Sequence, residues 1–156
     1  MKKIMFVCTG NICRSAMADK LLQKRLKDEE IADVFVDSCG LRAYSNSYST
    51  DEAINVMKRE YNTNLLDHLS KNIRDTDIEN FDLILCATNA HKTSIEYEYP
   101  GTKGKIYTMK EYVGYPEKDK DIKDPWGYPY KVYEEVAKEI SDVVEKLIIK
   151  IKEKGL

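Results

Sequence analysis

Residues 4–15 read Ile4-Met5-Phe6-Val7-Cys8-Thr9-Gly10-Asn11-Ile12-Cys13-Arg14-Ser15. The run from Ile4 to Val7 is apolar throughout, which is typical of a short strand buried on both faces of a parallel sheet. A tight loop follows, and Ser15 is a suitable N-cap for a helix whose apolar residues recur at helical spacing to about Asp28. The stretch therefore predicts a strand, a tight loop and a helix in direct succession.

Three further apolar runs predict strands. They are residues 34–36, 83–87 and 106–108. Helices are expected to begin at Thr50 and to run from about 131 to 152, and the proline- and glycine-containing stretch 112–130 is expected to be a long surface loop. Strands that alternate with helices imply right-handed crossovers, so we expect an α/β, Rossmann-like three-layer sandwich with a four-stranded parallel sheet and helices on both faces. Ligands of such sheets bind beyond the carboxyl ends of the strands, where residues 8–14 lie.

Composition describes an ordinary globular protein. A chain of 156 residues predicts a single domain, 1–156, and 42% hydrophobic with 33% charged residues excludes a disordered tail protein. The net charge of −2 argues against a nucleic-acid partner that needs a basic surface. Neither a membrane span nor the apolar core of a signal peptide is recognisable, so we expect a cytoplasmic protein with no membrane partner. Its four cysteines are then not expected to form a disulfide framework.

A cysteine directly after a buried strand, with an arginine six positions later, can form an anion site. Backbone N–H groups of the loop and of the first helical turn can surround a tetrahedral oxyanion, and the same partial positive charge stabilises a thiolate at Cys8. Arg14 offers a planar fork to two phosphate oxygens. Gly10 lets the backbone approach a ligand, and Asn11 tolerates a left-handed conformation. From this spacing alone, a packing role for Cys8 stays open.

The stretch Val7 to Ser15 closely resembles the signature of the low-molecular-weight protein tyrosine phosphatases, and the resemblance covers essentially the whole chain. It implies the phosphotyrosine protein phosphatase I-like fold, with Cys8 as nucleophile and Arg14 as phosphate ligand. The implied phosphate-binding loop is Thr9, Gly10, Asn11, Ile12, Cys13, Arg14 and Ser15. Asp124, in Asp124-Pro125-Trp126-Gly127, matches the family's Asp-Pro-aromatic general acid, although the dipeptide alone is equally a turn signal.

The resemblance also implies supporting residues and pocket walls. In the family, the counterparts of four residues form a hydrogen-bond network that holds the loop. These are Asn11, Ser15, Ser38 and His68. Three side chains are expected to form the walls of the substrate pocket. They are Ile12, Tyr44 and Trp126. His91 has no counterpart in this scheme and is expected to be solvated, and neither a metal nor a cofactor is expected.

The implied reaction hydrolyses a phosphorylated protein or peptide and releases inorganic phosphate. Cys8 attacks phosphorus while Asp124 protonates the leaving group, and Asp124 then activates water against the cysteinyl-phosphate. Ile12 matches the phosphotyrosine branch of the family, whereas Thr9-Gly10 and residues 107–113 resemble the protein-arginine-phosphatase branch. Phosphotyrosine is therefore the expected substrate, and phosphoarginine is the alternative.

Two other classes of function are disfavoured. A thiol-dependent arsenate reductase would share the Cys-x5-Arg spacing, but it needs a further cysteine pair, and Cys86 has no downstream partner. A catalytically silent phosphate-binding module would be expected to lose Cys8, Arg14 or Asp124.

Other residues keep two interpretations. In the family, Cys13 can pair with the nucleophile in a protective disulfide, and packing at the helix start is the alternative. Cys39 and Cys86 are expected to pack. Tyr128 and Tyr130 stand where some members carry phosphorylatable tyrosines, although packing explains them equally well. A monomer is expected.

Overall fold

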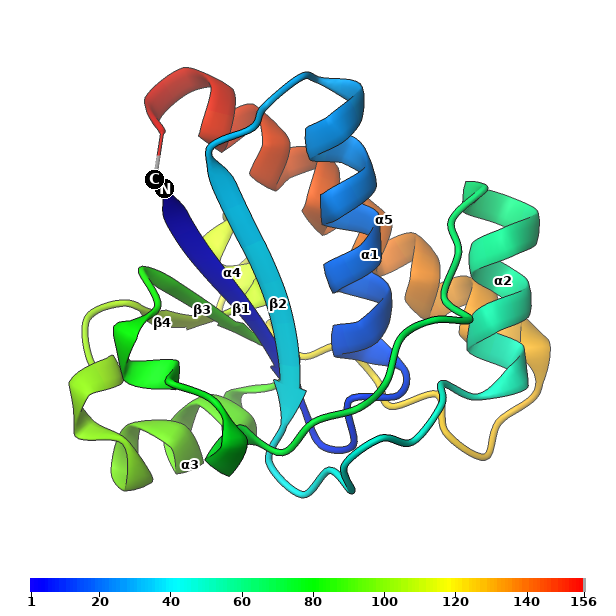
Figure 1. Ribbon diagram of the computed structural model, residues 1–156, viewed down its shortest axis with the longest axis horizontal. Helices are drawn as coiled ribbons and strands as arrows, with labels where there is room; N and C mark the ends of the chain where they lie inside the picture. The colour runs from blue at the N-terminus through cyan, green and yellow to red at the C-terminus, as the bar shows by residue number, and fades with distance from the viewer. Residues whose placement is uncertain (156) are drawn as a thin grey trace.

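The sheet of the computed structural model, which describes residues 1–155, has four parallel strands in the order β2-β1-β3-β4 (Figure 1). The strands are β1 (Lys2–Cys8), β2 (Val34–Gly40), β3 (Leu83–Cys86) and β4 (Ile106–Thr108). The register places Cys8 beside Gly40 and Val7 beside Cys86, so three strands end at nearly the same level. The expected α/β fold with a four-stranded parallel sheet is confirmed.

The central position of β1 explains its apolar run. The side chains of Ile4 and Phe6 belong to the core on one face of the sheet, and those of Met5 and Val7 to the core on the other. All four are fully buried. Alternation along a strand sends successive side chains to opposite faces, and here both faces are covered.

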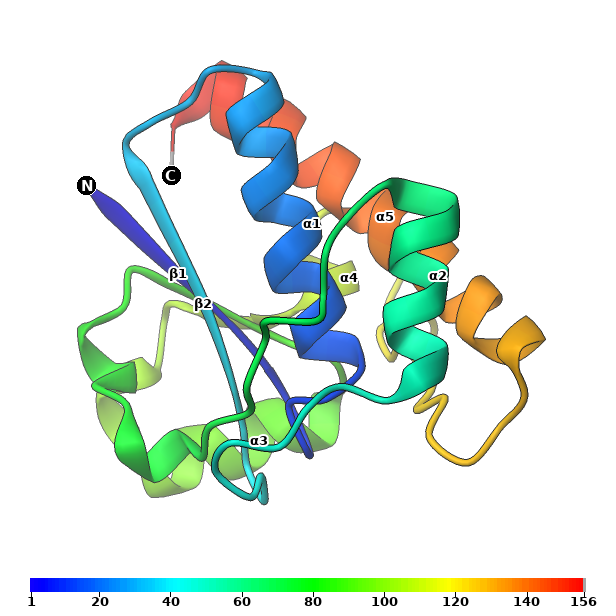
Figure 2. The same cartoon turned by 45° about the vertical axis from the view of Figure 1, so that its right-hand side comes forward.

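Helices cover both faces of the sheet, as Figures 1 and 2 show. The helices are α1 (Arg14–Asp28), α2 (Asp51–Tyr61), α3 (Asn89–Glu98), α4 (Met109–Tyr112) and α5 (Tyr130–Lys154), with short 3-10 helices η1 (Ile73–Asp75), η2 (Ile78–Asn80) and η3 (Pro100–Thr102). Helices α1 and α5 pack against each other on one face, where α2 contacts both of them, and Ile95 of α3 belongs to the core of the opposite face. The three expected layers are therefore present.

Helices α1 and α3 differ from the sequence expectations. The residue that caps α1 is Cys13, which makes no side-chain capping bond, so the expected Ser15 cap is wrong. Helix α3 was not expected, because it buries only His91 and Ile95 and its apolar stripe is weak. The expected start of α2 is confirmed, since the Thr50 side chain accepts from the N–H of Ala53.

The site region lies at the carboxyl edge of the sheet. There the loop between β1 and α1, the segment after β2, the end of β3 and the long loop 113–129 before α5 come together (Figure 1). Within residues 1–155, none of the helices combines the length and the apolar character that a bilayer crossing demands.

Candidate active site

The Cys8 thiol lies at the end of β1, where polar groups surround it. Its Sγ is 2.9 Å from Ser15 Oγ and accepts the backbone N–H of Asn11 at 3.3 Å. Because Asn11 Nδ2 donates to Ser15 Oγ at 2.8 Å, the Ser15 hydroxyl proton is free to point to Cys8 Sγ, which is nearer than the carbonyl oxygen of Cys39 at 3.4 Å. Two hydrogen bonds therefore hold the sulfur at the carboxyl end of β1.

Asn11 fixes the shape of the loop. It has the expected left-handed backbone, with φ of 56°, and its Oδ1 accepts the backbone N–H of Lys71 at 3.0 Å. Its carbonyl oxygen lies 2.8 Å from Nε2 of His68, and a carbonyl only accepts, so Nε2 carries the proton. Burial lowers the pKa of His68, which keeps this imidazole neutral. The structure therefore brings Asn11, Ser15 and His68 together.

Ser38 is placed differently from the network expected for it. Its hydroxyl donates to Asp19 Oδ2 at 2.8 Å, and no hydrogen bond joins it to the loop among residues 1–155. The register explains this, because Ser38 pairs with Phe6, two residues short of the strand end where Cys8 pairs with Gly40. Ser38 thus ties β2 to α1. Burial raises the pKa of Asp19 to about 6.

The glycine that the loop requires is Gly40 rather than Gly10. A Cβ on Gly40 would lie 2.5 Å from the carbonyl oxygen of Thr9 and 3.0 Å from the backbone nitrogen of Asn11. A Cβ on Gly10 would meet only the flexible side chain of Ile12, at 3.6 Å. Close packing of β2 against the loop therefore imposes glycine on the neighbouring strand.

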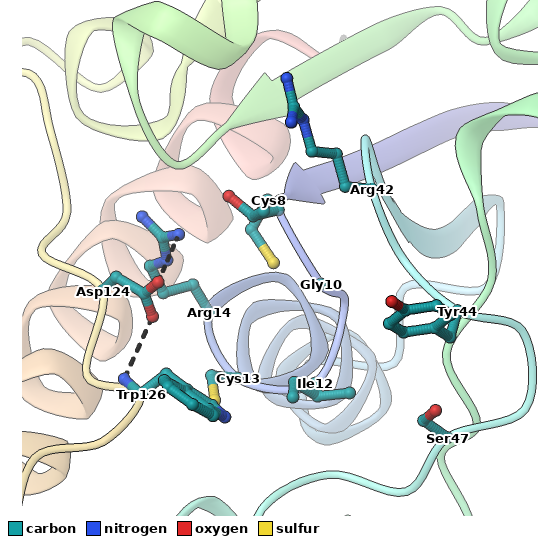
Figure 3. A pocket seen from close by; sticks show the side chains of 11 residues that line it. Cys8, Gly10, Ile12, Cys13, Arg14, Arg42, Tyr44, Ser47, Asp124 and Trp126 are labelled. Atoms are coloured by element: carbon teal, nitrogen blue, oxygen red, sulfur yellow. Dashed lines mark hydrogen bonds and ion pairs between the residues drawn. The ribbon is translucent and has the colours of Figure 1, made fainter.

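Arg14 and Asp124 form the polar side of the site (Figure 3). Arg14 is 4% exposed, and its Nη1 donates to the carbonyl oxygen of Ile122 at 2.9 Å. Its Nη2 lies 3.6 Å from Asp124 Oδ2, while its buried Nε has no hydrogen-bond partner among residues 1–155. Asp124 Oδ1 accepts the backbone N–H of Trp126 at 3.1 Å, which holds the carboxylate at the rim.

A pocket of about 320 Å³ opens over the loop. It is lined by Cys8, Thr9, Gly10, Ile12, Cys13, Arg14, Arg42, Tyr44, Ser47, Asp124 and Trp126. Figure 3 shows Trp126 and Tyr44 on opposite sides, with Ile12 between them. The expected wall residues therefore share one pocket. Arg42 and Ser47 were not expected, and their position just after β2, at the same edge as the loop, was the available signal.

The cysteines are all free, and they differ in environment. Cys13 Sγ lies 3.6 Å from both the Thr50 and the Tyr133 hydroxyl oxygens, and burial raises its pKa to about 11. In Figure 3 its sulfur points away from that of Cys8. Cys39 and Cys86 are fully buried, and burial raises the pKa of each thiol, in keeping with the expected packing role.

The expectation that His91 is solvated is wrong. The residue is 7% exposed, and its Nε2 lies 2.8 Å from Oγ1 of Thr9, inside the phosphate-binding loop predicted above. Its Nδ1 lies 2.9 Å from Oγ1 of Thr88. Burial and the nearby Arg14 charge lower the pKa of His91 to about 4. The sequence signal was the spacing of Thr88 and His91, since Thr88 caps α3.

The arrangement suits a tetrahedral anion beside a nucleophilic sulfur. The first turn of α1 carries no acidic side chain and no side-chain cap, so its backbone N–H groups remain available to an anion. Among residues 1–155, no three His, Cys, Asp or Glu side chains gather as a metal ion requires.

Comparison with known proteins agrees with this geometry. A family described as low molecular weight phosphotyrosine protein phosphatase matches residues 3–155. A protein-arginine-phosphatase of Bacillus subtilis (strain 168) is 32% identical over 149 residues, which cover 96% of each chain. The low molecular weight protein-tyrosine-phosphatase PtpB of Staphylococcus haemolyticus is 34% identical over 146 residues, 93% of this chain and 96% of that one.

A solved structure of a low molecular weight protein tyrosine phosphatase from T. tengcongensis superposes with a TM-score of 0.89 at 37% identity, covering 96% of this chain and 99% of that chain. Sequence and structure agree over nearly the full length. The chain belongs to the low molecular weight phosphotyrosine protein phosphatase family, a family of hydrolases that use a cysteine nucleophile.

Proposed function

We propose that this chain is a protein tyrosine phosphatase that hydrolyses phosphotyrosine through a cysteinyl-phosphate on Cys8. The observation that carries the proposal is the Arg14 guanidinium, which is buried beside the thiol with its Nε unpaired among residues 1–155. An unpaired buried donor costs about 1–3 kcal/mol, and more when it is charged. A phosphate oxygen accepting from Nε would remove this cost, so the site favours a bound phosphoryl group.

In the first step, the Cys8 thiolate attacks phosphorus in line. An S–P bond forms, the P–O bond to tyrosine breaks, and Asp124 donates its proton to the departing phenolate oxygen. Arg14 and the N–H groups at the start of α1 stabilise the equatorial oxygens. The hydrogen bonds from Ser15 and from the Asn11 N–H hold the sulfur in place before the attack.

In the second step, water attacks phosphorus and the S–P bond breaks. Asp124 now accepts a proton from the water, because the acid of the first step is the base of the second. The products are inorganic phosphate and the Cys8 thiolate. The contact of Asp124 with the Trp126 N–H supports this role, since it keeps the carboxylate at the rim in both steps.

The walls of the pocket favour a phenolic ring. Trp126 and Tyr44 are 64% and 84% exposed, and they flank the entrance (Figure 3). Ile12 is half-buried and presents a branched aliphatic side chain, which suits a flat ring and offers no hydrogen bond to a guanidinium. The relatives include both tyrosine and arginine phosphatases at similar identity, so Ile12 is the observation that favours phosphotyrosine.

The test is parallel turnover of matched phosphotyrosine, phosphoarginine and phosphoserine peptides by the wild-type chain and Ile12→Thr. We expect the wild type to prefer phosphotyrosine and Ile12→Thr to move the preference toward phosphoarginine. Cys8→Ser serves as the inactive control. A strong preference of the wild type for phosphoarginine would overturn the choice of substrate and leave the phosphatase chemistry in place.

We further propose that residues 1–156 act as one monomeric phosphatase domain in the cytoplasm, without a cofactor. Four free cysteines, one of them the nucleophile, suit a reducing compartment. Sedimentation of the full chain and its activity after dialysis against chelator test the monomer and the cofactor parts of this proposal.

A further inference from the structure

A chain of hydrogen bonds joins the phosphate loop to the start of α3. It consists of Thr9, His91 and Thr88, and we refer to it as the Thr9–His91–Thr88 chain. Nε2 of His91 is 2.8 Å from Thr9 Oγ1, Nδ1 is 2.9 Å from Thr88 Oγ1, and the backbone N–H of His91 donates to Thr88 Oγ1 at 3.2 Å. The mechanism above assigns no role to these three residues.

The hydrogen bonds determine where the protons lie. Thr88 Oγ1 already accepts from the backbone N–H of His91, and among residues 1–155 its own proton has no acceptor other than Nδ1. If Thr88 donates to Nδ1, the neutral imidazole carries its proton on Nε2 and donates it to Thr9 Oγ1. The Thr88 hydroxyl proton and both ring nitrogens of His91 then each have a hydrogen-bond partner. The reverse tautomer would leave the Thr88 proton without a partner.

This tautomer frees the Thr9 hydroxyl proton. Thr9 Oγ1 accepts from His91, so it cannot direct its own proton along the same line, and no other acceptor for it lies among residues 1–155. Thr9 is exposed and lines the pocket directly after the nucleophile. We infer that the Thr9 hydroxyl donates a hydrogen bond to an oxygen of the bound phosphoryl group, and that His91 is the positioning residue that directs it there. The inference rests on the proposed phosphatase function.

The charges around His91 favour the neutral state that this role needs. Arg14, on the loop side, lowers the pKa of the imidazole, while Asp121 and Asp124 of the long loop raise it. Burial is the largest influence, and the resulting pKa of about 4 leaves the ring neutral at neutral pH. A charged imidazole would donate from Nδ1 as well, and it would then break the bond from Thr88.

The experiment compares variants that keep or remove single hydrogen-bonding groups of the Thr9–His91–Thr88 chain. Thr9→Val removes the hydroxyl, and Thr9→Ser keeps it. His91→Asn reaches only the Nδ1 position, and His91→Gln restores a donor at the Nε2 position. Thr102→Val is the matched control. It removes a buried threonine hydroxyl of η3, which donates to the carbonyl oxygen of Tyr99 outside the pocket.

Three quantities are measured for each variant: the affinity for inorganic phosphate by calorimetry, and kcat and KM for a phosphotyrosine peptide. We expect Thr9→Val and His91→Asn each to weaken phosphate binding roughly tenfold to 150-fold, the range of one hydrogen bond to a charged group. Thr9→Ser and His91→Gln should bind nearly as well as the wild type. In the Thr9→Val background, His91→Asn should cause no further loss.

Wild-type phosphate affinity in Thr9→Val, or additive losses in the double variant, would overturn the inference. If the wild type did not hydrolyse the phosphotyrosine peptide, the proposed function would be overturned instead. The phosphate affinities would still test the role of Thr9. Nitrogen NMR of the wild-type protein needs no variant, so its result does not depend on how a variant folds. The sequence has only two histidines, which keeps the spectrum simple. Nitrogen NMR should find His91 protonated at Nε2 alone, and a proton on Nδ1 would refute the tautomer.

Discussion

Replacing Gly40 with alanine should disable the phosphate loop without touching a reacting group. The new Cβ would lie 2.5 Å from the Thr9 carbonyl oxygen, 2.9 Å from Ala43 Cβ and 3.0 Å from the Asn11 nitrogen, whereas ordinary contacts begin at 3.4 Å. Relief therefore requires the backbone to move by about 0.9 Å. All three neighbours are backbone atoms or a Cβ, so no side-chain rotation can supply that movement.

The magnitude follows from where the displacement falls. Overpacking costs about 1–3 kcal/mol of unfolding free energy, which lowers Tm by roughly 3–10 °C in a chain of this size. The Asn11 N–H donates to Cys8 Sγ, so the shift is transmitted directly to the nucleophile. A misplacement of about 1 Å costs roughly a hundredfold in rate. We therefore expect a large loss of kcat and a modest loss of Tm.

The assay is hydrolysis of p-nitrophenyl phosphate, with thermal unfolding followed by circular dichroism. Gly101→Ala is the matched control, because its Cβ would lie 2.6 Å from Glu79 Oε2, the far end of a flexible side chain remote from the pocket. This variant should lose some stability and keep its activity. If Gly40→Ala retained wild-type kcat, the claim that β2 holds the loop in its reactive shape would be refuted.

Three further predictions concern single side chains. Cys8→Ser should abolish turnover and Asp124→Ala should lower kcat by about a hundredfold or more, and wild-type hydrolysis of p-nitrophenyl phosphate by either variant would contradict the assignment. Burial raises the pKa of Asp19 from 3.8 to about 6, so the folded state binds an extra proton between these values and stability falls as pH rises through them. Asp19→Asn should therefore gain stability relative to the wild type between pH 4 and pH 7, and parallel urea titrations that show a constant difference would disprove this. After peroxide treatment, thiol reductant should restore the wild type but not Cys13→Ser, if Cys13 traps oxidised Cys8 as a disulfide, and equal recovery of both would exclude this role.

The parts of the site that lie close together in sequence could be predicted. The strand from Ile4 to Val7 is continuously apolar because it is central. The spacing of Cys8 and Arg14 around one loop predicts an anion site, and the family resemblance of the stretch from Val7 to Ser15 adds the role of Cys8 as nucleophile. The left-handed backbone of Asn11 follows from the tolerance of asparagine for that conformation, and the structure has it. Local pattern and local geometry coincide here because strand, loop and helix follow one another without interruption.

The supporting contacts could not be predicted from local pattern, because their partners are distant in sequence. His91 meets Thr9 across 82 positions, and nothing near either residue indicates the other. Gly40 is required by a loop that begins 31 positions earlier, at Thr9. For Ser15 the local pattern gave a wrong prediction. A serine at a helix start normally caps the helix, but here the Ser15 hydroxyl bonds to Cys8 and Asn11. A tertiary contact overrides the local preference.

The supporting groups of the loop are neutral, and this has a chemical reason. His68 and His91 both have lowered pKa values, so neither imidazole adds a positive charge to those of Arg14 and Arg42, which line the pocket. Another cation beside the loop would stabilise the Cys8 thiolate further, but a more stable thiolate is a weaker nucleophile. It would also hold inorganic phosphate more tightly and slow its release. Neutral imidazoles avoid both effects because they fix the direction of hydrogen bonds and add no charge. This is why a chain of net charge −2 can contain an anion site: its donors are mostly backbone and neutral side-chain groups, which net charge does not reveal.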